Sequence, residues 1–211
     1  MIKILFQGDS ITDMGRDRDD IHSLGWGYPR FAAPLISKKY PNIDFEFVDL
    51  GISGNQTKDL VGRLETDFID IQPDIVSILI GINDVWHHAG ERDWLSDEQF
   101  EENYRTVLEA VKQRTKAKIM IIEPFLIPVE DKLFFREDLY RKIEVIRKLA
   151  REYADVFLPL DGLLQSAFIG DNPLTFAEDG VHPTEKGAEF IGRLYAEYIS
   201  KLIDAVKNNY V

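Results

Sequence analysis

Three side chains near the two ends of the sequence could together cleave an ester. Ser10 lies in Gly8-Asp9-Ser10-Ile11, while Asp179 and His182 are three residues apart just before Pro183. A tight turn at that spacing can bring the carboxylate to one ring nitrogen of the histidine and leave the other for the serine hydroxyl. The histidine then takes the serine proton, and the aspartate orients the ring. We therefore predict Ser10 as nucleophile, His182 as base and Asp179 as the orienting acid.

Two further segments carry groups that could stabilise the oxyanion formed during ester cleavage. Gly54 lies in Gly51-Ile52-Ser53-Gly54-Asn55, where a residue without a side chain can present its backbone N–H. Asn83 lies in Gly81-Ile82-Asn83-Asp84 and can present its amide NH₂. Together with the backbone N–H of Ser10, these donors predict a three-donor oxyanion hole.

Short apolar runs alternate with longer amphipathic stretches along the chain. The apolar runs predict strands, and stretches with apolar residues at three- and four-residue steps predict helices. One helix opens with Ser96-Asp97-Glu98-Gln99, which has the form of a capping box. The predicted strands are 2–6, 45–48, 75–80, 119–122 and 156–158; the predicted helices are 28–40, 58–71, one that starts at 96, 135–153 and 183–206.

The alternation of strands and helices favours an α/β fold. Strands that are apolar throughout are typical of a parallel sheet covered on both faces, so we expect a three-layer α/β/α sandwich with five parallel strands. We expect residues 1–211 to form a single domain, because no linker divides the chain. In such sheets, ligands bind at the carboxyl ends of the strands, and the Ser10, Gly54 and Asn83 segments each follow a predicted strand.

The four segments, in this order, resemble those of the SGNH hydrolases, also called the GDSL esterase and lipase family. Ser10, Gly54, Asn83 and His182 stand at the four positions that name the family, and Ile11 replaces the leucine of the family motif. The resemblance covers nearly the whole chain. It implies a flavodoxin-like sandwich that hydrolyses esters with no metal and no cofactor.

A closer resemblance is to the bacterial intracellular carbohydrate acetylesterases of this family, such as acetylxylan esterases. It implies an acetylated sugar, such as a xylo-oligosaccharide, as the small-molecule substrate, and assembly as a homo-oligomer. Trp86 could face a pyranose ring, and Asp9 could contact its hydroxyls, although Asp9 and Asp84 could instead bond loop N–H groups. The motifs that carry this likeness are Gly8-Asp9-Ser10-Ile11-Thr12-Asp13, Gly25-Trp26-Gly27-Tyr28, Lys58-Asp59-Leu60 and Gly81-Ile82-Asn83-Asp84-Val85-Trp86.

Charge and composition narrow the range of partners. With 25 basic and 37 acidic side chains the formal net charge is −12, which disfavours nucleic acid and anionic lipid surfaces but not a neutral glycan. The chain has no cysteine, so disulfides, a thiolate nucleophile and a sulfur-bound zinc site are excluded. The first ten residues lack the features of a secretory signal and no apolar run is long enough to span a membrane, so we expect a cytoplasmic protein.

Three other hypotheses remain open from the residues. One is a lysophospholipase or thioesterase of the same family. A second is a metal-dependent phosphoesterase, and a third is a non-catalytic binding module with the same fold. The phosphoesterase would use Asp9, Asp84, His87, His88, Asp179 and His182.

Two segments near the predicted site have less certain roles. We interpret His87 and His88 as solvated loop histidines, although they are tempting metal ligands beside Asp84. The segment 126–129, followed by Phe134 and Phe135, could line an acyl or leaving-group pocket or form a wall of the core.

Overall fold

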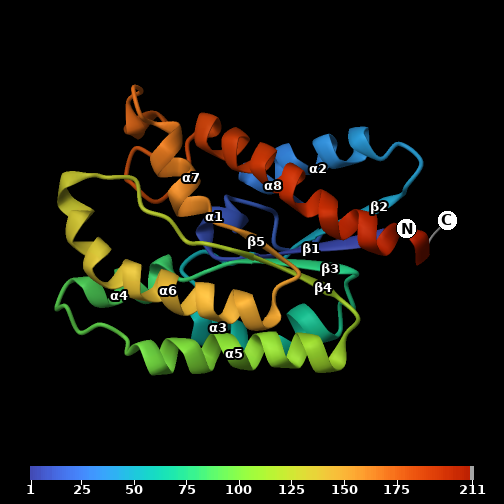
Figure 1. The fold of residues 1–211 in the computed structure, drawn as a ribbon, viewed down its shortest axis with the longest axis horizontal. Helices are drawn as coiled ribbons and strands as arrows, with labels where there is room; N and C mark the ends of the chain where they lie inside the picture. Colours follow the sequence, from blue (N-terminus) through green and yellow to red (C-terminus); the bar gives the residue numbers. More distant parts are fainter. Residues whose placement is uncertain (210–211) are drawn as a thin grey trace.

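The computed structural model describes residues 1–209 and contains a parallel sheet of five strands in the order β2-β1-β3-β4-β5 (Figure 1). This is the flavodoxin-like order, so the predicted α/β sandwich is confirmed. Residues 210 and 211, which the predicted domain also includes, lie outside the described residues. The strands are β1 (Ile2–Gly8), β2 (Phe45–Asp49), β3 (Ile75–Leu79), β4 (Lys118–Ile122) and β5 (Val156–Leu158).

The carboxyl ends of four neighbouring strands are aligned. Gly8 pairs with Leu79, Leu79 with Ile122, and Ile122 with Leu158. The segments that follow these strands therefore leave the sheet at the same edge. In the sheet, β2 lies on one side of β1, and β3, β4 and β5 lie on the other. The connections that leave β1 and β3 therefore diverge, and in such folds a crevice opens at this point.

Helices cover both faces of the sheet, as Figure 1 shows. On one face lie α2 (Tyr28–Lys39), α7 (Leu160–Ala167) and α8 (Glu185–Val206), and on the other lie α3 (Thr57–Gly62), α5 (Asp97–Arg114) and α6 (Arg136–Tyr153). The helices α1 (Ser10–Asp13) and α4 (Ile82–Ala89), like α7, follow directly after strands. Short helical turns occupy Glu65–Ile69, Glu130–Phe135, Pro173–Thr175 and Lys207–Asn209.

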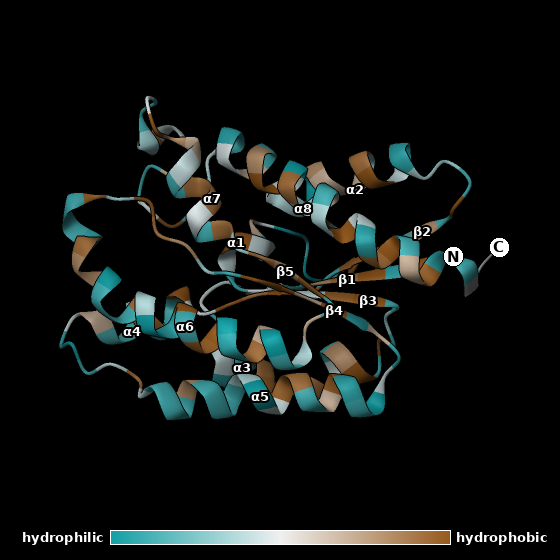
Figure 2. Cartoon of the chain, viewed as in Figure 1, coloured by the Kyte–Doolittle hydropathy of each residue, from teal (hydrophilic) through white to brown (hydrophobic). Residues whose placement is uncertain are grey.

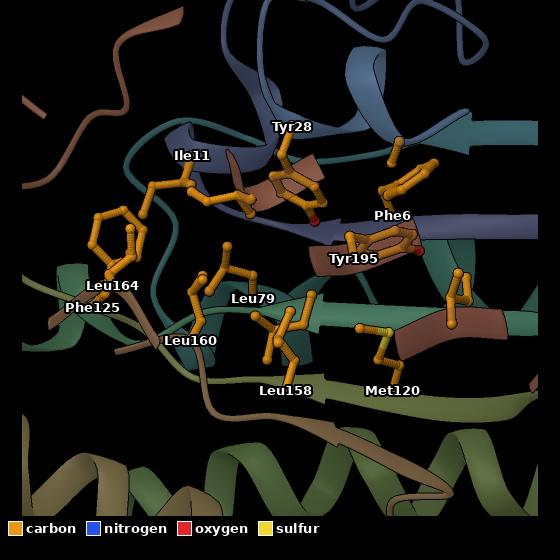
Figure 3. Close-up of a cluster of buried hydrophobic side chains, with 14 of the residues drawn as sticks. Phe6, Ile11, Tyr28, Leu79, Met120, Phe125, Leu158, Leu160, Leu164 and Tyr195 are labelled. Carbon is orange, nitrogen blue, oxygen red and sulfur yellow. The ribbon is translucent and has the colours of Figure 1, made fainter. Parts of the chain in front are cut away.

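The apolar side chains divide into two cores because successive residues of a strand point to opposite faces. Phe6 lies in the core under α2 and α8, where its ring is 5.0 Å from that of Tyr195 (Figure 3). Its neighbour Leu5 lies in the other core, with Tyr104 of α5. Figure 2 shows the same division, with apolar strands in the interior and hydrophilic outer faces on the helices.

Some predicted elements differ from the structure. The predicted helix 58–71 is two segments, α3 and a π-helical turn over Glu65–Ile69, with Arg63 ending the first. The division has a physical cause: the Arg63 side chain turns toward the sheet, and Gln7 donates from its amide to the Asp67 carbonyl at 2.7 Å. The helices α4 and α7 were not predicted.

The long helices α5 and α8 begin at polar caps. Ser96 accepts from the N–H of Gln99 at 3.1 Å, as the capping motif predicts. The last long helix starts at Glu185, two residues later than predicted, because Thr184 is its cap and accepts from the N–H of Gly187 at 3.2 Å. Within residues 1–209 no helix is both long and apolar enough to cross a membrane.

Candidate active site

Ser10 is the first residue of α1, immediately beyond β1. Asp9 caps this short helix by accepting from the N–H of Ile11 at 3.0 Å. The helix ends after one turn at Met14, whose φ of +33° lies in the left-handed region. The sharp turn out of the strand leaves Ser10 half-buried at the carboxyl edge of the sheet, with its side chain lining a cavity.

Ser10, His182 and Asp179 form a continuous hydrogen-bonded chain. The Ser10 Oγ lies 2.8 Å from Nε2 of His182, and Nδ1 of the same ring lies 2.7 Å from Oδ2 of Asp179. The other Asp179 oxygen, Oδ1, accepts from the N–H groups of Val181 and His182 at 2.9 and 2.8 Å. The two backbone N–H groups therefore hold Oδ1 of Asp179 in place, and Oδ2 faces the imidazole of His182.

Asp179 and His182 each stabilise the charged form of the other. The hydrogen bond that His182 donates to Asp179 raises the pKa of His182 above its usual value, against the opposing effect of burial. Burial alone would raise the pKa of Asp179, but the hydrogen bonds from His182 and the two backbone N–H groups outweigh it and hold that pKa well below its usual range. An ionised Asp179 fixes the proton of neutral His182 on Nδ1, so Nε2 can accept the proton of Ser10.

The turn that carries Asp179 and His182 rests on the segment after β4. Ile127 donates from its N–H to the Gly180 carbonyl at 2.8 Å. Gly180 has φ +85°, and a Cβ there would lie 2.7 Å from a methyl of Val129 and 2.8 Å from the Ile127 carbonyl oxygen. Of the two roles considered for segment 126–129, the structure therefore shows the wall: the segment supports this turn from behind.

Gly54 and Asn83 line the same cavity as Ser10. Gly54 has φ +84°, with no other group within 4 Å of where its Cβ would be. In the described part of the chain, the N–H groups of Ser10 and Gly54 have no hydrogen-bond acceptor. The Asn83 amide nitrogen donates one hydrogen to the Asn55 carbonyl at 3.1 Å, which leaves the second. These three donors are thus unoccupied at one open cavity of about 650 Å³.

A partly buried arginine organises the segments that hold these donors. Arg63 donates to the carbonyls of Leu50 at 2.8 Å and Gly8 at 3.2 Å, and to the side chain of Asn55 at 2.9 Å. Gly8 and Asn55 are close neighbours in sequence of Ser10 and Gly54. The sequence analysis missed this role, because an arginine on an amphipathic helix has no local feature that distinguishes it from a solvated one.

A second connection links α1 to the Gly54 segment. Asp13 accepts from the Ser53 hydroxyl at 2.7 Å and from its N–H at 2.9 Å. Asp13 is buried and also pairs with Arg18 at 2.5 Å. The motif Gly8-Asp9-Ser10-Ile11-Thr12-Asp13 contained this residue, but only its tertiary partner reveals its function.

Asp9 lies behind the cavity and not in it. Its side chain is only 1% exposed, so the predicted contact with sugar hydroxyls is replaced by the helix cap described above, the other role considered for this residue. Burial raises its pKa to about 7, against the hydrogen bond from Ile11 and the charge of His182. Its second carboxyl oxygen has no partner among residues 1–209.

Trp86 packs against the candidate base. Its ring centroid is 5.9 Å from that of His182 and 5.9 Å from that of Phe135, and the Lys132 ammonium lies 5.3 Å from it. Trp86 is half-buried and lines the cavity, so one part of its surface supports His182 while another faces the open space.

His87 and His88 lie on α4, not in a loop. His87 is exposed and lines the cavity, a position that the sequence analysis did not assign to it. No group of three or more His, Asp or Glu side chains in the described residues is arranged to hold a metal ion. The six residues considered for a phosphoesterase therefore do not form a metal cluster here.

Comparison with known proteins shows what this chain resembles. Residues 6–190 match the model of the GDSL-like Lipase/Acylhydrolase family. The chain is 32% identical over 204 residues to an acetylxylan esterase of Geobacillus stearothermophilus, with 93% of each sequence covered. The crystal structure of Axe2, an acetylxylan esterase of that organism, superposes with a TM-score of 0.85 at 31% identity and covers 95% of this chain and 94% of its own.

Other solved structures of Axe2 bear on the reaction. One variant is described as an acetyl-xylooligosaccharide esterase, at 32% identity and a TM-score of 0.85, with 94% of each chain covered. Three are described as catalytic mutants, in which alanine replaces a serine, an aspartate or a histidine. In that enzyme the aspartate and the histidine are three positions apart.

Proposed function

Because this chain belongs to the GDSL-like lipase/acylhydrolase family and is a carboxylic ester hydrolase, we propose that it cleaves acetyl esters with Ser10 as its nucleophile. The observation that carries the proposal is the 2.8 Å contact between Ser10 Oγ and His182 Nε2, with Asp179 at 2.7 Å behind the ring. The matching spacing of aspartate and histidine in the catalytic mutants of Axe2 supports these roles.

The reaction divides into two steps. Ser10 Oγ attacks the carbonyl carbon while His182 Nε2 takes its proton, and the resulting oxyanion accepts hydrogen bonds from the N–H groups of Ser10 and Gly54 and the amide of Asn83. The intermediate collapses to an acetyl-serine as the alcohol leaves with the proton from His182. A water then loses a proton to His182 and attacks the acetyl group, and His182 returns that proton to Ser10 Oγ as the bond to the acyl carbon breaks, which releases acetate and free Ser10.

An O-acetylated sugar, such as a xylo-oligosaccharide, is the substrate class that we propose. The cavity is open and contains the aromatic rings of Trp26 and Trp86 beside polar groups, a combination that suits a pyranose. The net charge of −12 does not oppose a neutral glycan. The related enzymes of Geobacillus are described as acting on acetylxylan and acetylated xylo-oligosaccharides, which supports this choice.

The test of the nucleophile is direct. Ser10→Ala should reduce turnover of an aryl acetate by about 10⁴-fold or more while the far-UV circular dichroism spectrum stays unchanged. A serine-directed phosphonate should add its mass to Ser10 in the wild-type protein and not in the variant. EDTA should have no effect. Retained activity in Ser10→Ala, or activity abolished by EDTA without phosphonate labelling, would reject the proposal.

The acyl group is tested separately. With aryl esters of increasing chain length, the rate should be highest for acetate and should fall steeply for longer chains. A maximum at long chains would instead favour the lysophospholipase or thioesterase alternative. Hydrolysis of acetylated xylose and acetylated xylotriose then tests the sugar, and the size of the protein in solution tests the expected homo-oligomer.

A further inference from the structure

Trp26 is an exposed aromatic residue on a tightly packed backbone segment. It is 65% exposed, the largest such fraction among the aromatic residues at the surface of residues 1–209. The backbone N–H of Trp26 donates to the Met14 carbonyl at 2.9 Å. Gly25 has φ +54°, and a Cβ there would lie 2.5 Å from the Asp13 carbonyl oxygen, so the Trp26 backbone is packed tightly against the end of α1.

Exposure of a tryptophan is costly unless a ligand covers it, since burial of an aromatic ring is favourable. The other cavity tryptophan, Trp86, is already packed against His182 and Phe135. Trp26 instead has an open surface beside the site, and its backbone needs no ordering when a ligand arrives. A fixed platform of this kind contributes affinity at low entropic cost.

The surface around Trp26 is hollowed on two sides. On one side is the cavity that contains Ser10. On the other is a second hollow of about 330 Å³, and Met14 and Trp26 line both. The second hollow is lined by Met14, Trp26, Arg30, Phe31, Pro183 and Glu185. Pro183 directly follows His182 in the sequence, so the hollow is next to the candidate base.

The lining of the second hollow combines apolar surface with charged ends. The Arg30 guanidinium lies 4.6 Å from the centre of the Trp26 ring. Neither Arg30 nor Glu185 forms an ion pair with another side chain in the portion of the chain that the structure describes. A pyranose presents C–H groups on its faces and hydroxyls around its rim, so it can pack on the ring while Arg30 donates and Glu185 accepts hydrogen bonds.

We propose that Trp26, with Arg30 and Glu185, forms a subsite for a second sugar unit of an acetylated oligosaccharide, next to the unit whose acetyl group is at Ser10. This inference rests on the proposed function, because it needs an acetylated glycan as substrate. It explains why an ester hydrolase would keep an exposed tryptophan at the edge of its cavity. It also gives the longer substrate an advantage over the acetylated monosaccharide.

The test compares kcat/KM for acetylated xylose, acetylated xylotriose and an aryl acetate. Wild-type protein should prefer the trisaccharide to the monosaccharide. Trp26→Ala should reduce this preference by about tenfold, which corresponds to about 1.4 kcal/mol of binding energy. The loss should appear mainly as a higher KM for the trisaccharide, because a contact far from the reacting atoms binds ground state and transition state alike. Trp26→Phe should restore part of it.

Tyr140 provides a matched control. It is 58% exposed and has the Arg136 guanidinium 5.3 Å from its ring centre, but it lies on α6, on the opposite face of the sheet from α2 and α8 (Figure 1). Tyr140→Ala should leave the preference for the trisaccharide as in the wild type.

The outcomes separate the two ideas. If the wild type hydrolyses both sugar acetates equally well, or if Trp26→Ala lowers kcat/KM for both by the same factor, the subsite is rejected while the proposed function stands. If the wild type cleaves the aryl acetate but neither sugar acetate, the proposed sugar substrate is rejected and the subsite with it, while acetyl ester cleavage at Ser10 stands.

Discussion

Asp84 accepts hydrogen bonds from both the hydroxyl of Thr57, at 2.6 Å, and its backbone N–H, at 3.1 Å. This contact joins the segment that carries Gly54 to the helix that carries Asn83. Gln56 strengthens the junction by donating from its amide to the Asn83 carbonyl at 3.2 Å. Gly54 and Asn83, the two proposed oxyanion donors that come from different segments, are therefore held at a fixed separation before a substrate arrives.

Replacement of Asn83 tests this arrangement. Asn83→Ala should lower kcat for an aryl acetate by about 10²- to 10³-fold with little change in KM, because its amide contacts the oxyanion only in the transition state. Asn42→Ala, an exposed position ahead of β2 at the opposite edge of the sheet, is the control and should keep wild-type kinetics. A loss in Asn83→Ala that lies wholly in KM would argue against the oxyanion role.

Gly180 supports the turn between Asp179 and His182. Gly180→Ala should destabilise the protein by about 2 kcal/mol or more and reduce activity strongly, because the new methyl group collides with Val129 and Ile127 as well as straining a left-handed backbone. Thermal denaturation and aryl acetate turnover measure the two effects.

Gly170 separates collision from backbone strain. It has φ +82°, close to the +85° of Gly180, but no group lies within 4 Å of where its Cβ would be. Gly170→Ala should cost only about 1 kcal/mol and retain activity. Equal effects of the two substitutions would show that packing against the segment after β4 is unimportant.

Arg63 connects the loops after the first two strands. Arg63→Ala should destabilise the protein by about 3 kcal/mol or more, because it removes the positive partner of the Asp67 carboxylate and a donor to each of the Leu50 and Gly8 carbonyls. The activity that remains at a temperature where the variant is folded should still be reduced, since Ser10 and Gly54 lose a common support. Chemical denaturation and turnover measure these effects.

Arg193 supplies the comparison for Arg63. Its ion pair with Glu189 lies on the exposed surface of α8. Arg193→Ala should change stability by at most about 0.5 kcal/mol and leave turnover as it was. If Arg63→Ala were equally mild, the role assigned to its hydrogen bonds would be wrong.

Asp9 should affect the pH dependence of activity. The hydrogen bond that His182 donates to Asp179 and, to a smaller degree, the charge of Asp9 raise the pKa of His182. Activity requires neutral His182, so it should fall as the pH drops through that pKa. Asp9→Asn keeps a capping side chain but removes the charge, and it should move the acidic limb of kcat/KM to lower pH. An unmoved or upward-shifted limb would contradict the coupling.

The same substitution should alter the pH dependence of stability. Burial raises the pKa of Asp9 from 3.8 to about 7, so the folded protein holds a proton there that the unfolded chain releases. The protonated Asp9 therefore contributes fully to the free energy of unfolding below pH 3.8. This contribution, of up to a few kcal/mol, is lost as the pH rises toward 7. Denaturation at pH 4 and pH 7 should show that decline in the wild type and a smaller one in Asp9→Asn.

Periodicity and local motifs determined much of this protein. Apolar runs identified all five strands, because a strand buried on both faces needs apolar residues at successive positions. The placement of Ser10, Gly54 and Asn83 after strands already indicated a common edge. The spacing of Asp179 and His182 also predicted their contact, since three residues suffice for one turn. These features depend on residues close together in sequence.

Tertiary structure decided which side chains face the cavity and which support it. Asp9 and Trp86 were both candidate sugar contacts, but Asp9 is buried behind Ser10, whereas Trp86 packs on His182 and also lines the cavity. Trp26 became a candidate platform only once the fold placed it beside Ser10. Arg63 gained its role from partners 13 and 55 residues away in the sequence. Asp13 gained its role from a partner 40 residues away. Such choices depend on which surfaces the packed layers leave open, and the local sequence does not contain that information.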